Sequence, residues 1–272
     1  MKKIKSVMPI GLWVRGNQVE AVWLEKPKWA HNKPHLNPPP EPHFTTVPLM
    51  PQVTLANRII REMTVSLKPH KTELLFISGV LPNNVWERSI VVPQQLSEQE
   101  CYQQCEHLLA SELPIPLSQV WFDYHATSLK QGTLLEMNAV LIEKAQEQMK
   151  QFIPLQVRVL DSVSHALKRA FDYLDSQQPK EALYLYVDDQ YAIAFQDKGF
   201  DFNVLQISEA NLTALYEQFC QRYQVEPETV CVYLRNPTQE HISECEKRQW
   251  LQYQTKLPMI ALGLGLWHLN FS

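Results

Sequence analysis

The stretch from Ser97 to His125 constrains the fold of this chain more than any other, because a helix start, a helix end and a following strand can all be read from it. Ser97 and Glu100 have the spacing of a capping box, in which each side chain bonds a backbone N–H left unpaired at a helix start. Apolar residues then recur at helical spacing until Pro114, which removes a backbone donor and disfavours helical geometry just before it. After Pro116, apolar and polar residues alternate with the period of a strand. The segment predicts a helix, a rigid turn and a strand, without evident catalytic chemistry.

Size and charge limit the functions open to this chain. Its 272 residues can bury a core of ordinary size, as one large domain or as two lobes. The formal net charge is -4, and no long run of Lys and Arg follows the lysines at positions 2, 3 and 5. A basic surface for nucleic acid is therefore not expected, and we predict no direct binding to DNA.

The patterns of a membrane-spanning or secreted protein are also missing. The longest apolar runs, such as Met259 to Trp267, are far shorter than the roughly 20 residues of a membrane-spanning helix. The N-terminus has no apolar segment typical of a signal peptide, so we predict a cytoplasmic protein without membrane insertion. The cysteines lack the spacing of a zinc site or a disulfide scaffold, and reduced core thiols are expected. They are Cys101, Cys105, Cys220, Cys231 and Cys245.

The first fifty residues predict a hairpin followed by a loop. Ser6–Val14 and Gln18–Leu24 are apolar runs separated by a short polar turn, which is typical of two antiparallel strands. Lys26–Pro51 is dense in proline, which fixes backbone angles and removes donors, and it predicts an exposed loop or a polyproline segment. A surface connection explains this segment more simply than a recognition sequence for a proline-binding partner.

The rest of the chain alternates helical and strand patterns. After a helix from Val53 and a strand over Leu74–Ile77, the first half continues as strand, helix, strand, strand, helix, strand, helix. The second half restarts with strands, followed by a helix capped by Ser208, another strand and a polar helix near Gln239. The segments expected in the first half are Glu87–Val92, the helix after Ser97, Val120–Tyr124, Thr133–Ile142, Glu143–Phe152, Leu155–Leu160 and Ser162–Leu174. Those in the second half are Ala182–Val187, Tyr191–Phe195, Phe200–Ile207, Val230–Leu234 and a buried, glycine-punctuated run over Ile260–Trp267.

Several landmarks together resemble the PilM family of actin-like type IV pilus assembly proteins. The segment ELPIPLSQVWFDY, which ends at Asp123 and Tyr124, is similar to the family's helix, Pro-apolar-Pro turn and strand. Ile90–Pro93, Asp161–Arg169 and the ALGLGL run at Ala261–Leu266 are similar to further family landmarks, so the resemblance spans nearly the whole chain. The likeness is greatest to the divergent branch that contains HofM and the competence protein ComA.

This resemblance implies a fold and a division into domains. The implied fold is α/β and actin-like (ribonuclease H-like), with two lobes and a small βαββα insertion in the first. Residues 1–178 are then the first lobe, with the insertion at about 81–154, and residues 179–272 form a reduced second lobe.

The resemblance also implies where a nucleotide site would lie, and the sequence departs from the family there. The family reads Gly-Ile-Asp-Ile-Gly; aligned on Gly11, this chain has Trp13 in place of the Asp and Arg15 in place of the second Gly. Glu20 replaces a family Lys, which reverses a charge beside the phosphates. In the second lobe Asp188 matches, but the Gly two residues later is Gln190. The vestigial site comprises Gly11, Trp13, Arg15, Asp188 and Gly263.

Two functions are therefore compared. The first is a scaffold of a type IV pilus or competence DNA-uptake machine that does not hydrolyse ATP and needs neither ATP nor Mg²⁺. The alternative is a divergent nucleotide-binding ATPase of the same machine. Phosphate binding requires small residues where Trp13 and Arg15 stand, and this favours the scaffold. A peptide-binding actin-like protein outside pilus biology is a third reading.

The partner implied by the resemblance is a PilN-like single-span inner-membrane protein. PilM proteins bind its cytoplasmic N-terminal tail in a groove between the first lobe and the insertion, and cytoplasmic pilus motor ATPases are further expected partners. An extended peptide would gain affinity there from backbone pairing and from apolar pockets. The alternative for Ile115 and Leu117 is that they are core residues of the insertion. The expected groove residues are Ile90, Val92, Pro114, Ile115, Pro116, Leu117 and Trp121.

Other constellations predict neither a metal site nor a hydrolase. Cys101 and Cys105 would share a helix face, but His107 would point elsewhere and no fourth ligand is near in sequence. His241, Glu244 and Cys245 also have helical spacing, which an exposed polar helix explains. Asp161–His165 lacks the glycine elbow of a nucleophilic serine. We therefore predict no catalytic residue.

Overall fold

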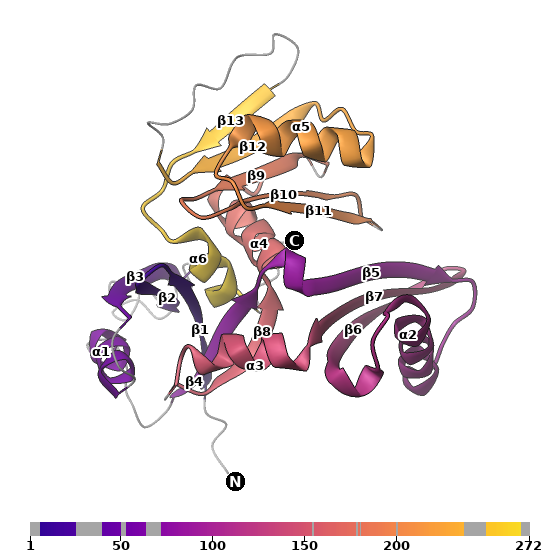
Figure 1. Ribbon diagram of the computed structural model, residues 1–272, viewed down its shortest axis with the longest axis horizontal. Helices are drawn as coiled ribbons and strands as arrows, with labels where there is room; N and C mark the ends of the chain where they lie inside the picture. The colour runs from indigo at the N-terminus through magenta and orange to yellow at the C-terminus, as the bar shows by residue number, and fades with distance from the viewer. Residues whose placement is uncertain are drawn as a thin grey trace, which may run out of the picture. The chain divides into compact units, whose positions relative to one another are not determined.

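The computed structural model describes residues 6–25, 40–49, 53–63, 72–153, 155–177, 179, 181–199, 201–236 and 249–267 (Figure 1). The chain packs as two units. One comprises residues 1–80, 147–177 and 255–272, and the other comprises residues 81–146 and 178–254. The predicted polar helix near Gln239 and the prediction for Cys245 lie outside the described residues.

The first unit contains a five-stranded sheet in the order β3-β2-β1-β4-β8. β1, β2 and β3 form an antiparallel meander, and β4 and β8 continue the sheet in parallel with β1. The predicted hairpin is confirmed, and Gly16 turns it with a φ of 55°, a left-handed conformation that favours glycine. The strands are β1 (Ser6–Arg15), β2 (Gln18–Glu25), β3 (Glu41–Pro48), β4 (Thr72–Val80) and β8 (Val157–Ser162).

The proline-rich prediction is wrong for its second half, because Glu41–Pro48 forms β3 and pairs with β2 along its whole length. Pro42 and Pro48 stand near the two ends of this strand, at the edge of the sheet. An edge strand tolerates proline because it needs backbone donors on only one side. Of the remainder of the predicted loop, residues 26–39 lie outside the described residues.

Helices pack against this sheet. α1 (Val53–Met63) contacts β3, and α4 (Val163–Leu174) follows β8 directly. α6 (Met259–Gly265) is buried throughout and packs on β1, β2 and α4. On the other face of β1, a cluster of apolar side chains fills the core; it includes Ile10, Leu12, Ile59, Phe76 and Phe152.

A second five-stranded sheet lies in the other unit, in the order β11-β10-β9-β12-β13. It repeats the plan of the first: an antiparallel meander, then two strands parallel to the first strand of the meander. α5 (Leu212–Tyr223) packs on one face, where leucine and valine side chains form the core. The strands are β9 (Leu183–Val187), β10 (Ala192–Asp197), β11 (Phe202–Ile207), β12 (Thr229–Leu234) and β13 (Gln249–Tyr253).

Two details of this second sheet differ from the sequence analysis. The cap of α5 is Asn211, whose side chain accepts from the Ala214 N–H at 2.8 Å, rather than Ser208. Asn is as good a cap as Ser, and the helix starts where its apolar stripe begins, at Leu212. The strand β13 was not predicted.

The insertion is the predicted βαββα unit, and the prediction is confirmed. Its three-stranded sheet has the order β5-β7-β6, with α2 over one face (Figure 1). The capping box is formed, since the Ser97 Oγ accepts from the Glu100 N–H and the Glu100 carboxylate accepts from the Ser97 N–H. The elements are β5 (Val85–Val92), α2 (Glu98–Glu112), β6 (Val120–Leu129), β7 (Gly132–Leu141) and α3 (Ile142–Lys150).

The predicted lobe boundaries at 178 and 179, and at 81 and 154 for the insertion, stay a prediction. What the packing shows is that α6, at the C-terminal end of the described chain, lies against the first sheet. Among the described residues, no helix is both long and apolar enough to cross a membrane.

Candidate functional site

Trp13 lies inside the first sheet rather than at an open site. Its side chain on β1 is 5% exposed, and a Cβ placed on Gly79 of β4 would stand 3.4 Å from Trp13 Cζ3. The indole therefore packs directly over the backbone of Gly79, a residue that the sequence analysis did not single out. Within the described residues Trp13 Nε1 is buried and has no hydrogen-bond partner.

Arg15 and Glu20 form an ion pair across the first hairpin. The Arg15 Nε lies 3.3 Å from the Glu20 Oε1, and Glu20 is 1% exposed. The two residues stand where the family has a glycine and a lysine, so one side chain neutralises the other at this turn. A self-neutralised pair offers less attraction to phosphate than a lysine does.

Gly11 and Gly263 have a packing role. A Cβ on Gly11 would lie 2.0 Å from the Ala261 carbonyl oxygen, and a Cβ on Gly263 would lie 1.7 Å from the Ala166 carbonyl oxygen. Both contacts are impossible for a larger residue, so these glycines let α6 pack on β1 and on α4. The Gly263 carbonyl oxygen also accepts from the Arg169 Nε at 3.0 Å.

Asp188, the expected remnant of the second phosphate loop, accepts hydrogen bonds from residues of its own hairpin. Its Oδ1 accepts from the N–H groups of Gln190 and Tyr191, at 2.8 and 3.2 Å, and its Oδ2 accepts from the Tyr186 hydroxyl at 3.1 Å. Asp188 is 3% exposed. Burial, and then the charge of Asp188, raise the pKa of Tyr186 well above its usual value, so the phenol stays a donor.

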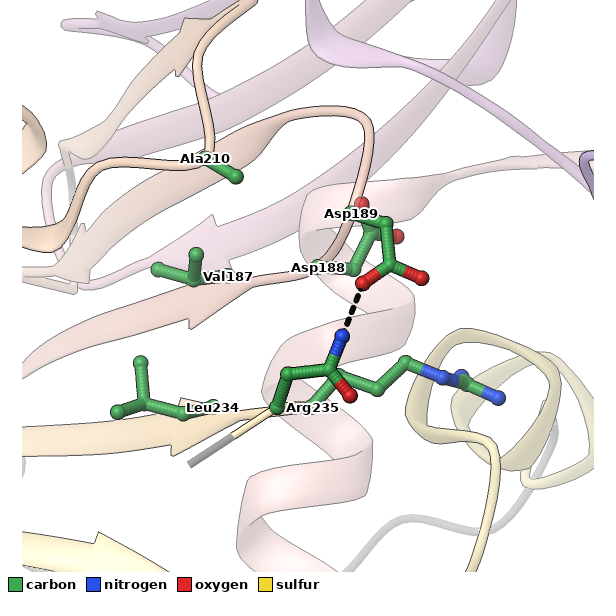
Figure 2. Close-up of a pocket in the computed structure, with 7 residues that line it drawn as sticks. Val187, Asp188, Asp189, Ala210, Leu234 and Arg235 are labelled. Atoms are coloured by element: carbon green, nitrogen blue, oxygen red, sulfur yellow. Dashed lines mark hydrogen bonds between the residues drawn. The ribbon is translucent and has the colours of Figure 1, made fainter. Parts of the chain in front are cut away.

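The carboxyl ends of β9 and β12 enclose only a small pocket (Figure 2). Asp189 and Asn236 join across it through a side-chain hydrogen bond, drawn as the dashed line in Figure 2. The volume is about 20 Å³, which is room for about one water. Its lining residues are Val187, Asp188, Asp189, Ala210, Leu234, Arg235 and Asn236.

The expected groove residues occupy different places in the insertion. Ile90 and Val92 belong to the core beneath α2. Ile115 and Leu117 pack against a second core cluster, which agrees with their alternative interpretation as core residues. The prolines at 114 and 116 are exposed on the turn.

Trp121 lies on the opposite face of the three-stranded sheet. It pairs with Val140, whereas the next residue, Phe122, pairs with Ala139 and packs on the α2 side. Because neighbouring residues of a strand point to opposite faces, Trp121 cannot share a surface with Ile115. Its side chain is 44% exposed.

Ile115 lines a pocket of about 240 Å³ at one end of the insertion. Most of the lining is apolar, and Leu141 on its rim is one of the large apolar side chains that remain exposed. The other members come from the start of β5 and the end of β7, which sequence reasoning did not connect with the proline turn. Besides Ile115 and Leu141 they are Asn83, Asn84, Val85, Trp86, Leu113, Val120, Ala139, Val140 and Lys144.

The cysteines and the histidine of the predicted helix after Ser97 do not form a site. Cys101 and Cys105 are buried free thiols on the sheet-facing side of α2, and burial raises the pKa of Cys105 to about 11, with a smaller contribution from Cys101. His107 is exposed. In the part of the chain that the structure describes, no three His, Cys, Asp or Glu side chains gather closely enough to bind a metal ion.

Comparison with protein families decides the affiliation of the chain. The family of type IV pilus assembly proteins called PilM matches residues 54–213, which is more than half of the sequence. This chain is a member of the PilM family. A search of curated protein sequences gave no match.

Solved structures agree with the fold of this PilM-family chain. One is a PilM-PilN type IV pilus biogenesis complex, which is 14% identical with a TM-score of 0.61 and covers 95% of this chain and 97% of its own. Another is the cytoplasmic domain of EpsL, an inner-membrane component of the type II secretion system of Vibrio cholerae. It is 10% identical with a TM-score of 0.57 and covers 97% of this chain and 95% of its own. The predicted actin-like α/β fold is therefore confirmed.

Proposed function

We propose that this PilM-family chain is a scaffold that binds the cytoplasmic N-terminal tail of a PilN-like single-span inner-membrane protein and does not hydrolyse ATP. Membership of the PilM family and the likeness to a PilM-PilN complex support the partner. The likeness to the cytoplasmic domain of EpsL, an inner-membrane component, supports a place at the cytoplasmic side of that membrane, held there by the partner. Within this proposal the chain belongs to the HofM and ComA branch, serves competence and DNA uptake, and communicates with cytoplasmic motor ATPases.

The proposed lack of hydrolysis rests on the side chains of the first hairpin, where bulky and paired residues stand in place of the family's phosphate-binding residues. Trp13 stands where the family has its catalytic Asp, and its indole is buried against Gly79. Arg15 and Glu20 neutralise each other beside it. A nucleotide would have to displace a buried indole and also break this ion pair, and no gain in phosphate contacts compensates for both.

The apolar pocket around Ile115 supports the proposed capture of a tail. It combines a rigid proline turn with the ends of two strands, so an apolar side chain of an extended peptide can enter it without reorganising the insertion. Lys144 at the rim gives the peptide one cationic contact. In this proposal Ile115 serves both as part of the core and as a wall of the pocket.

Binding of a fluorescent PilN-like N-terminal peptide to the full chain tests this proposal. Leu141→Asp places a charge on the rim of the pocket, and we expect affinity to fall at least about ten-fold, because a buried apolar contact is replaced by a carboxylate. Val91→Asp is the matched control, because Val91 is an exposed apolar residue on the opposite face of the same sheet. Fluorescence anisotropy measures affinity, and circular dichroism confirms that both variants fold.

Two results would contradict the proposed partner site. One is equal loss of binding in the two variants; the other is unchanged binding in Leu141→Asp. A wild-type chain that does not bind the peptide at all would remove the proposed partner itself.

Thermal unfolding with and without Mg-ATP separates the scaffold from the alternative, a divergent nucleotide-binding ATPase. A nucleotide at about 100 times its Kd would stabilise the chain by about 2.7 kcal/mol, or roughly 5 to 10 °C for a protein of this size. We expect a shift below about 1 °C at millimolar Mg-ATP, since the hairpin offers no phosphate cradle. A shift of several degrees together with ATP turnover would establish the alternative.

A further inference from the structure

A second, polar pocket lies at the end of the second sheet opposite to Asp188. It has a volume of about 460 Å³ and is formed by the start of β9, the end of β10, the residues after α5 and the start of β12. Its floor is made of buried residues, which are Ala182, Gln196, Pro227 and Thr229. Its rim is made of exposed side chains, among them Glu181, Lys198, Glu226 and Glu228.

Gln196 in the floor has an acceptor that the protein leaves unused. The residue is 4% exposed, and its Nε2 donates to the Glu181 carbonyl oxygen at 2.8 Å. This bond fixes the orientation of the amide, because a carbonyl oxygen cannot accept from the amide oxygen. The Oε1 is buried and has no hydrogen-bond partner in the described part of the chain.

A buried acceptor without a donor is rare in folded proteins, so the Gln196 Oε1 is the point at which a bound donor would gain most. An N–H donor that entered the pocket would satisfy the Gln196 Oε1. The rim favours a donor that carries positive charge, since it has three carboxylates and one ammonium group. None of these four side chains forms an ion pair with another described residue.

We propose that this pocket binds an organic cation with N–H donors, an ammonium or guanidinium group, with one N–H bonded to the Gln196 Oε1 and the charge held by Glu181, Glu226 and Glu228. The size is that of a ligand pocket rather than of a bare metal site. The inference goes beyond the proposed pilus function and does not depend on it.

Such a cation has two sources, a free polyamine or a Lys or Arg side chain of a partner protein. The two probes are spermidine and the peptide acetyl-Gly-Arg-Gly-amide, each titrated into the full ¹⁵N-labelled chain. We expect saturable shifts of the Gln196 side-chain amide signal in NMR spectra with at least one of them. Saturation by spermidine alone assigns a free polyamine, saturation by the peptide alone assigns a partner's side chain, and either supports the site.

Charge variants on the rim give effects of opposite sign. Glu226→Gln and Glu228→Gln each remove an attractive charge and are expected to weaken binding about five-fold, whereas Lys198→Gln removes a repulsive charge and is expected to strengthen it by a similar factor. Glu209→Gln is the matched control, because Glu209 is an exposed carboxylate of the same unit that does not line the pocket. All four changes are on the surface and leave the floor intact.

Gln196→Met tests the acceptor itself. Met has a similar length and no strong acceptor, so binding should be lost while circular dichroism shows a folded chain. Three results would overturn the proposal: no saturable shift with either probe, a Glu209→Gln effect as large as those of the rim variants, or unchanged binding in Gln196→Met. A failed PilN-like peptide experiment would leave each of these readouts unaffected.

Discussion

The two five-stranded sheets of this chain have the same strand order but different chemistry in their first turn. In the first sheet the β1–β2 turn is two residues long, uses the left-handed Gly16 and is flanked by the Arg15–Glu20 pair. In the second sheet the β9–β10 turn is held by one carboxylate, that of Asp188, which accepts two backbone N–H groups and a tyrosine hydroxyl. One fold plan therefore tolerates two unrelated ways to close the same hairpin.

This difference separates what the fold requires from what a nucleotide site requires. The Arg15 and Glu20 side chains bind each other in the first turn, and the Asp188 carboxylate accepts hydrogen bonds from its own turn in the second. A phosphate-binding turn must instead leave its backbone donors and its carboxylate available. Retention of the fold without retention of open turns is consistent with a proposed role in binding rather than hydrolysis.

The largest loss of stability is expected at Gly11 in the first strand of the first sheet, since the matching strand of the second sheet has no glycine. Gly11 in β1 lies under α6, whereas β9 contains no glycine. Gly11→Ala would place a Cβ 2.0 Å from the Ala261 carbonyl oxygen, so we expect a loss of about 3 kcal/mol or more in the free energy of unfolding. Gly16→Asn is the control in open space, with a change within about 1 kcal/mol. Urea unfolding measures both, and a well-tolerated Gly11→Ala would show that α6 is not seated on β1.

The ion pair of the first hairpin gives the next effect. Arg15→Met leaves the buried Glu20 carboxylate without this partner, and we expect a loss of about 2 to 3 kcal/mol, which is below the range for fully buried pairs because Arg15 is partly exposed. Arg158→Met in the same sheet breaks an exposed pair with Glu73 and should cost less than about 1 kcal/mol. Equal losses in urea unfolding would mean that the Arg15–Glu20 pair contributes no more than a surface pair.

The turn of the second sheet gives a smaller loss. Asp188→Ala removes the acceptor of three hydrogen bonds, two of them buried, and we expect about 2 kcal/mol or more; the small pocket beside Asp188 has room for about one water to bond a freed donor. Asp189→Ala removes one exposed hydrogen bond to Asn236 and should cost less than about 1 kcal/mol. Chemical unfolding ranks the two variants, and the reverse order would make Asp189 the carboxylate on which the turn depends.

Most elements of the fold could be predicted from local patterns, because caps, prolines and apolar periodicity act within one segment. The capping box at Ser97 and the proline at 114 fix both ends of α2, and strand alternation fixes β6. β3 could not be predicted, because proline is disfavoured in strands and only its place at the sheet edge makes it acceptable. That place is a property of the sheet and not of the segment.

The site was less predictable, because a residue type does not reveal what the residue contacts. Gly11 and Gly263 were singled out as parts of a vestigial nucleotide site, whereas the contacts that require glycine there lie on α6 and α4, far away in sequence. Ile115 was expected in a groove, but its neighbours Trp86 and Leu141 come from strands about 25 residues away on either side, and local patterns do not show which strands meet the proline turn. Trp121 lies on the face opposite to Phe122, as strand alternation requires, so its assignment to the same groove as Ile115 conflicted with the pattern of its own strand.

The smallest effect concerns the insertion, which interrupts the first sheet between β4 and β8. Ser97→Ala removes the cap of α2 and should cost about 1 kcal/mol at neutral pH. The hydrogen bonds from Ser97 hold the pKa of Glu100 below its usual value, so this contribution is present above that usual value and is lost as the pH falls through the lowered pKa. The difference in the free energy of unfolding between wild type and Ser97→Ala should therefore shrink in acid.

Ser111→Ala on the same helix is the control for loss of a hydroxyl. The Ser111 hydroxyl donates to the Leu108 carbonyl oxygen, and its removal should show no such pH dependence. Unfolding at neutral and acidic pH checks both variants, and a constant difference would show that the cap acts without Glu100.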